Sequence, residues 1–140
     1  MKITKSLLLA AATAFAFSSA AVADETPLGK EMSTMNKAYK ALKKNASDAS
    51  KKADNLESLA KIKKSLEASI PLEPKHTKDQ PAAAKPAYLE KYKKQMQDLI
   101  AAFDDVKKGI EAGNDAAVKA AFDKIGDLKK KGHEDFGADD

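Results

Sequence analysis

The stretch from Leu89 to Leu128, LEKYKKQMQDLIAAFDDVKKGIEAGNDAAVKAAFDKIGDL, decides the fold. Its apolar residues recur every three or four positions, first from Leu89 to Ile110 and again from Val118 to Leu128. This spacing places them on one face of a helix, because an α-helix has about 3.6 residues per turn. The stretch therefore predicts two amphipathic helices, each of which buries one apolar stripe.

Between the two stripes, Gly113 and Asn114 mark the end of one helix and the start of the next. Glycine commonly ends a helix in the left-handed conformation, and asparagine is a strong N-cap residue. A connection this short makes the second helix run back along the first. Residues 86–112 and 115–136 are therefore predicted to form an antiparallel pair of helices.

The same periodicity appears in residues 28–42 and 56–70, and it predicts helices over about 26–45 and 51–70. Residues 71–86 contain four prolines and show no periodicity, which predicts a long connecting loop. The sequence thus predicts an all-α fold. We expect an antiparallel up-down-up-down four-helix bundle with a long proline-rich loop between its second and third helices.

The first 23 residues have the three-part layout of a secretory signal peptide. Lysines at the start precede an apolar run from Leu7 to Phe17, and Ala21-Val22-Ala23 offers a small-residue cleavage site. The apolar run is shorter than the ~20 residues that a membrane span needs. We therefore expect export to the periplasm, removal of residues 1–23, and a single domain over 24–140 without membrane contact.

Charge and composition exclude several classes of function. The chain has 25 basic and 21 acidic side chains and a formal net charge of +4, and cleavage would remove Lys2 and Lys5. Interleaved charges of both signs in a nearly neutral domain argue against nucleic acid as a partner. The sequence has no cysteine, no glycine-rich phosphate loop and no Ser/His/Asp grouping, so we expect no enzymatic activity.

The residues left to carry chemistry are soft ligands: Met32, Met35, Met96 and His133. Helical phase places His133 at the edge of the buried face of the last helix. Met32 and Met35 are early interior positions of the first helix, whose start lies beside the end of the fourth in such a bundle. Either thioether can therefore face the imidazole, as in the axial pair of an electron-transfer haem.

At these residues the chain resembles the cytochrome b562 family of periplasmic four-helix bundles, which bind one non-covalent haem through methionine and histidine. The resemblance covers the mature chain. The sequence MSTMN at residues 32–36, followed by Tyr39, is similar to the family's first helix, and the run from Gly113 to His133 matches its last helix in register. The resemblance implies that Met32 and His133 are the axial ligands, with Met35 as the alternative methionine.

The resemblance also implies which residues surround the haem. Tyr92 and Met96 fall where the family packs apolar and aromatic side chains around the macrocycle. The related cytochromes c′ carry a C-x-x-C-H motif in the register of KKKGH, residues 129–133, and the absence of both cysteines here implies a b-type haem. Lys129 stands at the position of one of those cysteines, where its cation could screen a haem propionate.

These observations lead to two hypotheses. The first is a periplasmic electron-transfer protein with one non-covalent haem b per chain, a monomer or weak dimer whose lysine-rich rim attracts an acidic redox partner protein. The second is a haem-free periplasmic binding or stress-related bundle, in which Met32, Met35 and His133 chelate copper(I). The second histidine, His76, lies in the proline-rich loop and has no assigned role in either hypothesis.

Overall fold

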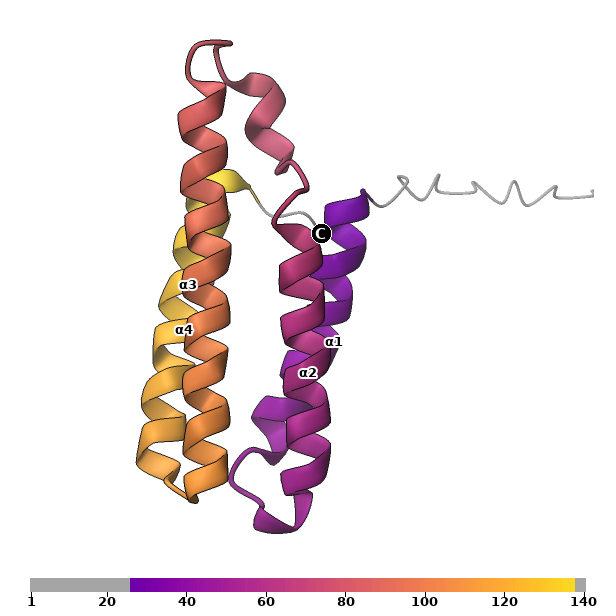
Figure 1. Ribbon diagram of the computed structural model, residues 1–140, viewed down its shortest axis with the longest axis vertical. Helices are drawn as coiled ribbons and strands as arrows, with labels where there is room; N and C mark the ends of the chain where they lie inside the picture. The colour runs from indigo at the N-terminus through magenta and orange to yellow at the C-terminus, as the bar shows by residue number, and fades with distance from the viewer. Residues whose placement is uncertain (1–25, 138–140) are drawn as a thin grey trace, which may run out of the picture.

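The computed structural model describes residues 26–137, which form four long helices joined by short segments (Figure 1). The helices are α1 (Pro27–Asn45), α2 (Lys52–Ser69), α3 (Lys85–Ala112) and α4 (Asp115–Phe136), with 3₁₀ turns η1 (Ala49–Lys51) and η2 (Lys75–Asp79). The expected signal peptide, residues 1–23, lies outside the described residues. Within residues 26–137, no helix carries an apolar run that could cross a bilayer.

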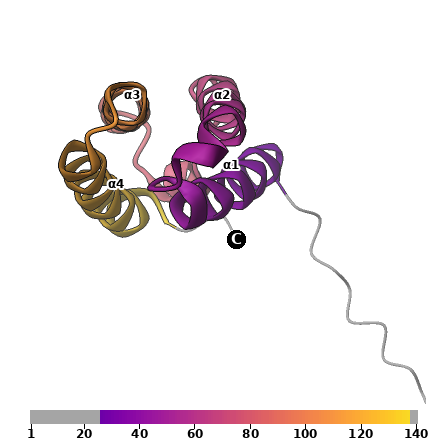
Figure 2. The same ribbon diagram turned by 90° about the horizontal axis from the view of Figure 1, so that it is seen from below.

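The four helices pack antiparallel in one bundle, which confirms the predicted fold class. Helix α1 packs on α2, α2 on α3, and α3 on α4. Helices α1 and α4 lie beside each other and complete the bundle, as the view along it shows (Figure 2). We call the space between them the α1–α4 seam, and the side chains that bridge it are Asn36 and Tyr39 from α1 and Phe122 and Lys129 from α4.

Local interactions explain where the helices begin and end. The Oγ1 of Thr26 accepts a hydrogen bond from the backbone N–H of Gly29 at 2.9 Å, which caps the start of α1. Gly113 ends α3 with φ of 64°, and the Oδ1 of Asn114 accepts a bond from the N–H of Ala117 at 3.0 Å. The roles predicted for Gly113 and Asn114 are thereby confirmed.

The apolar stripes meet in a single core. Leu42, Ile62, Leu66, Val106 and Ile125 are completely buried. Burying an aliphatic side chain of this size contributes about 1.5–3 kcal/mol, so this inner layer is a main source of the stability of the bundle.

The connection between α2 and α3 is more ordered than the sequence predicted. Its turn η2 packs against α3 and α4, with the side chain of Thr77 buried. The ring of His76 lies against Gly137, where an added Cβ would come within 2.6 Å of His76 Cδ2. The Nδ1 of His76 lies 3.0 Å from the Oδ2 of Asp79. The connection therefore docks on the bundle end at which α4 finishes.

Candidate functional site

A cleft of about 90 Å³ opens at the bundle end where α1 begins and α4 finishes. Its walls come from α1, α3 and α4, with Pro74 of the connecting segment at one side. The cleft is lined by all six residues selected from the sequence: Met32, Met35, Tyr92, Met96, Lys129 and His133. The structure therefore brings the six together, while their role as ligands stays a prediction.

The two methionines of α1 differ in burial. Met35 is 2% exposed and belongs to the fully buried core, whereas Met32 is partly exposed and packs against that core. Met96 of α3 forms the opposite wall and is 8% exposed. Both methionines of α1 line the cleft, and Met32 is the more exposed of the two.

His133 lies in the last turn of α4 and is exposed. Its backbone carbonyl accepts a hydrogen bond from the N–H of Gly137 at 3.1 Å, which closes the end of the helix. Among residues 26–137 its imidazole has no hydrogen-bond or ion-pair partner. A neutral imidazole with a free ring nitrogen is a good metal ligand, so His133 can coordinate without first breaking another contact.

Lys129 bridges the α1–α4 seam. Its Nζ donates a hydrogen bond to the Oδ1 of Asn36 at 2.9 Å and lies 4.7 Å from the ring centroid of Tyr39. Burial lowers the pKa of Lys129, and the positive charges of Lys40 and Lys43 lower it further. No carboxylate in the described part of the chain pairs with this amine, so a ligand that carries an acid group would supply the missing counter-charge.

Gln95 is a site residue that the sequence reasoning missed. It is 7% exposed, and its Nε2 donates to the backbone carbonyl of Leu128 at 2.8 Å. A Cβ on Gly132 would lie 2.7 Å from this Nε2, so the amide fits because residue 132 has no side chain. Gln95 thereby ties α3 to the turn that presents His133. The sequence held one clue to this role, because Gln95 is a polar residue at a position of α3 that helical spacing places toward the core.

An aromatic group forms the end of the cleft. The ring of Phe136 lies edge-on to Tyr88 and to Tyr92, with centroids 5.2 Å and 5.4 Å apart. The hydroxyl of Tyr92 donates to the backbone carbonyl of Ser69 at 2.9 Å, so this ring is held between helices α2 and α4. Tyr92 and Phe136 line the cleft, so their rings give it an apolar floor.

A comparison with protein-family models matches the family described as cytochrome b562 over residues 27–136. The chain belongs to the cytochrome b562 family. The match spans all four helices. Membership of the cytochrome b562 family implies a haem cofactor, and its members are typically electron carriers rather than enzymes. Comparisons with curated proteins and with solved structures found no significant match.

The side chains that line the cleft are of the chemical types that bind the haem of a cytochrome b562. A thioether and an imidazole come from facing helices, and a half-buried cation stands beside apolar walls. Residues 26–137 contain no cluster of three or more histidine or carboxylate side chains that could hold a bare metal ion. The cleft, at about 90 Å³, is smaller than the roughly 300–1,000 Å³ of typical cofactor sites, so it has to widen to admit a macrocycle.

Proposed function

We propose that this chain is a periplasmic electron-transfer protein that binds one non-covalent haem b, with Met32 and His133 as axial ligands. The observation that carries the proposal is that these two side chains line one cleft from facing helices, in a member of the cytochrome b562 family. When bound, the haem supplies one-electron iron chemistry. Two protein ligands leave no open coordination position, which favours electron transfer over reaction with oxygen.

The surrounding side chains have distinct roles in this proposal. Met32 supplies the thioether, and Met35 stays in the core because its exposed fraction is only 2%. Tyr92 and Met96 form the apolar contact surface for the macrocycle. Lys129 exchanges its hydrogen bond to Asn36 for a charge-assisted bond to a propionate. The chain has no cysteine, so no thioether link to the haem can form.

The periplasmic location rests on the layout of residues 1–23, which is that of a signal peptide. The family match begins at residue 27, after the proposed cleavage site. Fractionation of cells that express the full chain, with the mass of the periplasmic product, tests this part of the proposal. A product that begins at Asp24 supports it, and an uncleaved cytoplasmic product contradicts it.

Titration of the purified mature chain with haemin tests the ligation. We expect saturation at one haem per chain and sharp low-spin visible bands after reduction. Met32→Leu and His133→Ala should abolish the low-spin spectrum, because each removes one axial ligand. Met35→Leu and His76→Ala are the matched controls and should keep it. Haem uptake without low-spin bands, or loss of the bands only in Met35→Leu, contradicts the assignment.

A second candidate function is copper(I) binding by the haem-free chain. Every methionine within residues 26–137 lines the cleft together with His133, and thioether and imidazole ligands suit copper(I). Anaerobic titration against a chromophoric copper(I) chelator would show one ion per chain, lost in Met32→Leu and displaced by haem. Equal copper binding by the haem-loaded and haem-free chains would place the ion outside the cleft and contradict this candidate.

A further inference from the structure

Helix α1 differs from the other helices in its charge. Its sequence, PLGKEMSTMNKAYKALKKN, contains five lysines and a single acidic residue, Glu31. In α2, α3 and α4 the acidic side chains nearly match the lysines in number. The excess positive charge of the described chain is therefore concentrated on one helix.

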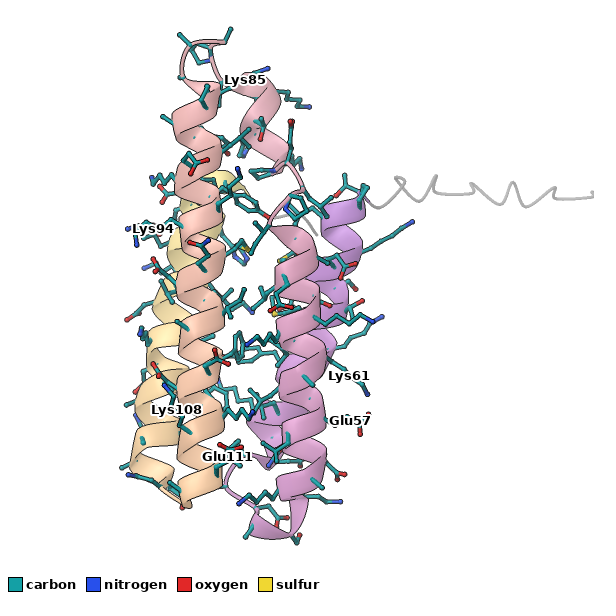
Figure 3. The ribbon with its side chains drawn as sticks, viewed as in Figure 1. Glu57, Lys61, Lys85, Lys94, Lys108 and Glu111 are labelled. Carbon is teal, nitrogen blue, oxygen red and sulfur yellow. The ribbon has the colours of Figure 1, made fainter. Side chains whose placement is uncertain are left out.

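The lysines of α1 also lack the ion pairs found elsewhere. Lys61 pairs with Glu57 on α2 at 2.7 Å, and Lys94 pairs with Asp98 on α3 at 3.2 Å. Figure 3 shows Glu57 and Lys61 on the outside of α2, and Lys94 on the outside of α3. In the part of the chain that the structure describes, no lysine of α1 forms an ion pair.

Four of these lysines form a group that we call the lysine patch: Lys37, Lys40, Lys43 and Lys44. All four are exposed. Lys40 and Lys43 stand four positions after the seam residues Asn36 and Tyr39, which both contact Lys129 of α4, so they lie one turn further along the same face of α1. The lysine patch therefore reaches the α1–α4 seam, where the charges of Lys40 and Lys43 lower the pKa of the Lys129 amine. Like charges three or four residues apart on a helix repel each other, and none of these lysines has an ion-paired acidic partner in the described chain.

We propose that the lysine patch is a docking surface for an acidic redox partner protein, beside the α1–α4 seam, whose Asn36 and Lys129 also line the cleft. That the partner is a redox protein rests on the proposed function. That the lysine patch binds an acidic surface follows from its charge, with or without haem. Exposed charges of this kind accelerate the encounter and form short-lived complexes that weaken with salt. Such a complex suits a carrier that must leave its partner after each electron.

An acidic protein fits this surface better than a membrane does. The large apolar residues of α1 point into the bundle, and the exposed positions of the described helix carry lysine, threonine, proline or alanine. A helix that lies in a membrane interface needs large apolar side chains on its outer face to insert between lipids. The lysine patch therefore offers charge without an apolar anchor.

Charge reversal with a matched control tests the proposal. The test pair is Lys40→Glu with Lys43→Glu, and the control pair is Lys64→Glu on α2 with Lys108→Glu on α3, so both proteins have the same net charge. The probe is a ten-residue oligoglutamate peptide, and amide chemical shifts of the full mature chain report its binding. We expect shifts confined to α1 and the end of α4, and affinity lowered about tenfold in the test pair only.

Three outcomes would overturn the proposal: shifts spread over all four helices, equal weakening by both pairs, or tighter binding of phosphatidylglycerol vesicles through the same lysines. Measuring both the haem-loaded and the haem-free chain separates this inference from the proposed function. If haem uptake fails while peptide binding still depends on Lys40 and Lys43, the proposed function is wrong and the docking surface stands. If both pairs weaken peptide binding equally in a chain that takes up haem, the docking surface is wrong and the proposed function stands.

Discussion

The amine of Lys129 lies 2.9 Å from the amide oxygen of Asn36, and this hydrogen bond joins α4 to α1 across the seam between two residues that both line the cleft. The same amine lies over the ring of Tyr39. Within residues 26–137 the half-buried cation thus has a neutral partner and an aromatic face, but no acid. This arrangement holds the two helices together while it leaves the charge of Lys129 available to an anionic ligand.

Replacing Lys129 should weaken haem binding more than it affects the fold. Lys129→Met keeps the apolar stem and removes the charge that would pair with a propionate. We expect haem affinity to fall about tenfold, since a charge-assisted hydrogen bond contributes on the order of 1.5 kcal/mol. Competition with a haem-binding apoprotein measures the affinity, and Lys130→Met, at an exposed neighbour, is the control. Equal affinities of the two variants would contradict a propionate role.

The lowered pKa of Lys129 predicts how the stability of the haem-free chain depends on pH. Between that lowered pKa and the ordinary lysine value of 10.5, the unfolded chain holds a proton that the folded chain has released. The contribution of Lys129 to the free energy of unfolding therefore rises with pH in this window. Burial raises the pKa of Tyr39 above 10.0, which has the opposite effect at higher pH, so measurements belong below pH 10.

Urea unfolding of the haem-free chain at several pH values between 8 and 10 measures this effect. As the pH rises, the free energy of unfolding of the wild type should increase relative to that of Lys129→Met. A bound propionate would stabilise the charged amine, so the same difference should lose this slope in the haem-loaded chain. A slope that is identical with and without haem would exclude contact between Lys129 and the ligand.

The fold was predictable because its signals are local. The spacing of Leu89 to Ile110 identifies a helix without reference to any other element, and Gly113 with Asn114 determines the turn that follows. The ordered turn η2 gave no such signal, because it is held by contacts with distant residues such as that between His76 and Gly137.

The candidate site was predictable to the extent that helical phase and topology determine it. These two properties place Met32, Met35 and His133 at one bundle end, with Met96 as a further candidate ligand by residue type, and the family resemblance added Tyr92 and Lys129. The partners of these residues were not predictable. Lys129 and Asn36 are 93 positions apart, and an amide side chain carries no pattern that identifies its distant partner.

The unequal burial of the two methionines of α1 predicts unequal effects on stability. Met35→Ala removes a fully buried side chain and should cost about 2–5 kcal/mol in the haem-free chain. Met32 is partly exposed, so Met32→Ala leaves a smaller cavity and should cost less than Met35→Ala. Urea midpoints of the two variants test the order, and the opposite order would place Met32 in the core and remove the argument for Met32 as ligand.

The two glycines in the C-terminal half of α4 should respond differently to alanine. A Cβ on Gly126 meets nothing within 4 Å, so Gly126→Ala should stabilise the helix by about 0.5–1 kcal/mol. A Cβ on Gly132 would lie 2.7 Å from the Nε2 of Gln95 and displace it from the carbonyl of Leu128. Gly132→Ala should therefore not stabilise the otherwise wild-type chain. In a chain that already carries Gln95→Ala, the same substitution should stabilise the helix as Gly126→Ala does. Additive effects of the two substitutions would show that Gln95 does not occupy this space.

The lysine patch predicts opposite responses of the reduced haem-loaded chain to small oxidants of opposite charge. If electrons leave near the α1–α4 seam, oxidation by the anion ferricyanide should slow as salt is added, because the attraction is screened over about 8 Å at physiological ionic strength. Lys40→Glu with Lys43→Glu should slow that reaction and accelerate oxidation by the cation hexaammineruthenium(III), each by a few-fold. Lys64→Glu with Lys108→Glu has the same net charge and should change either rate less. Stopped-flow oxidation rates distinguish the cases, since equal effects of the two pairs would assign the response to the net charge of the protein rather than to the charge beside the seam.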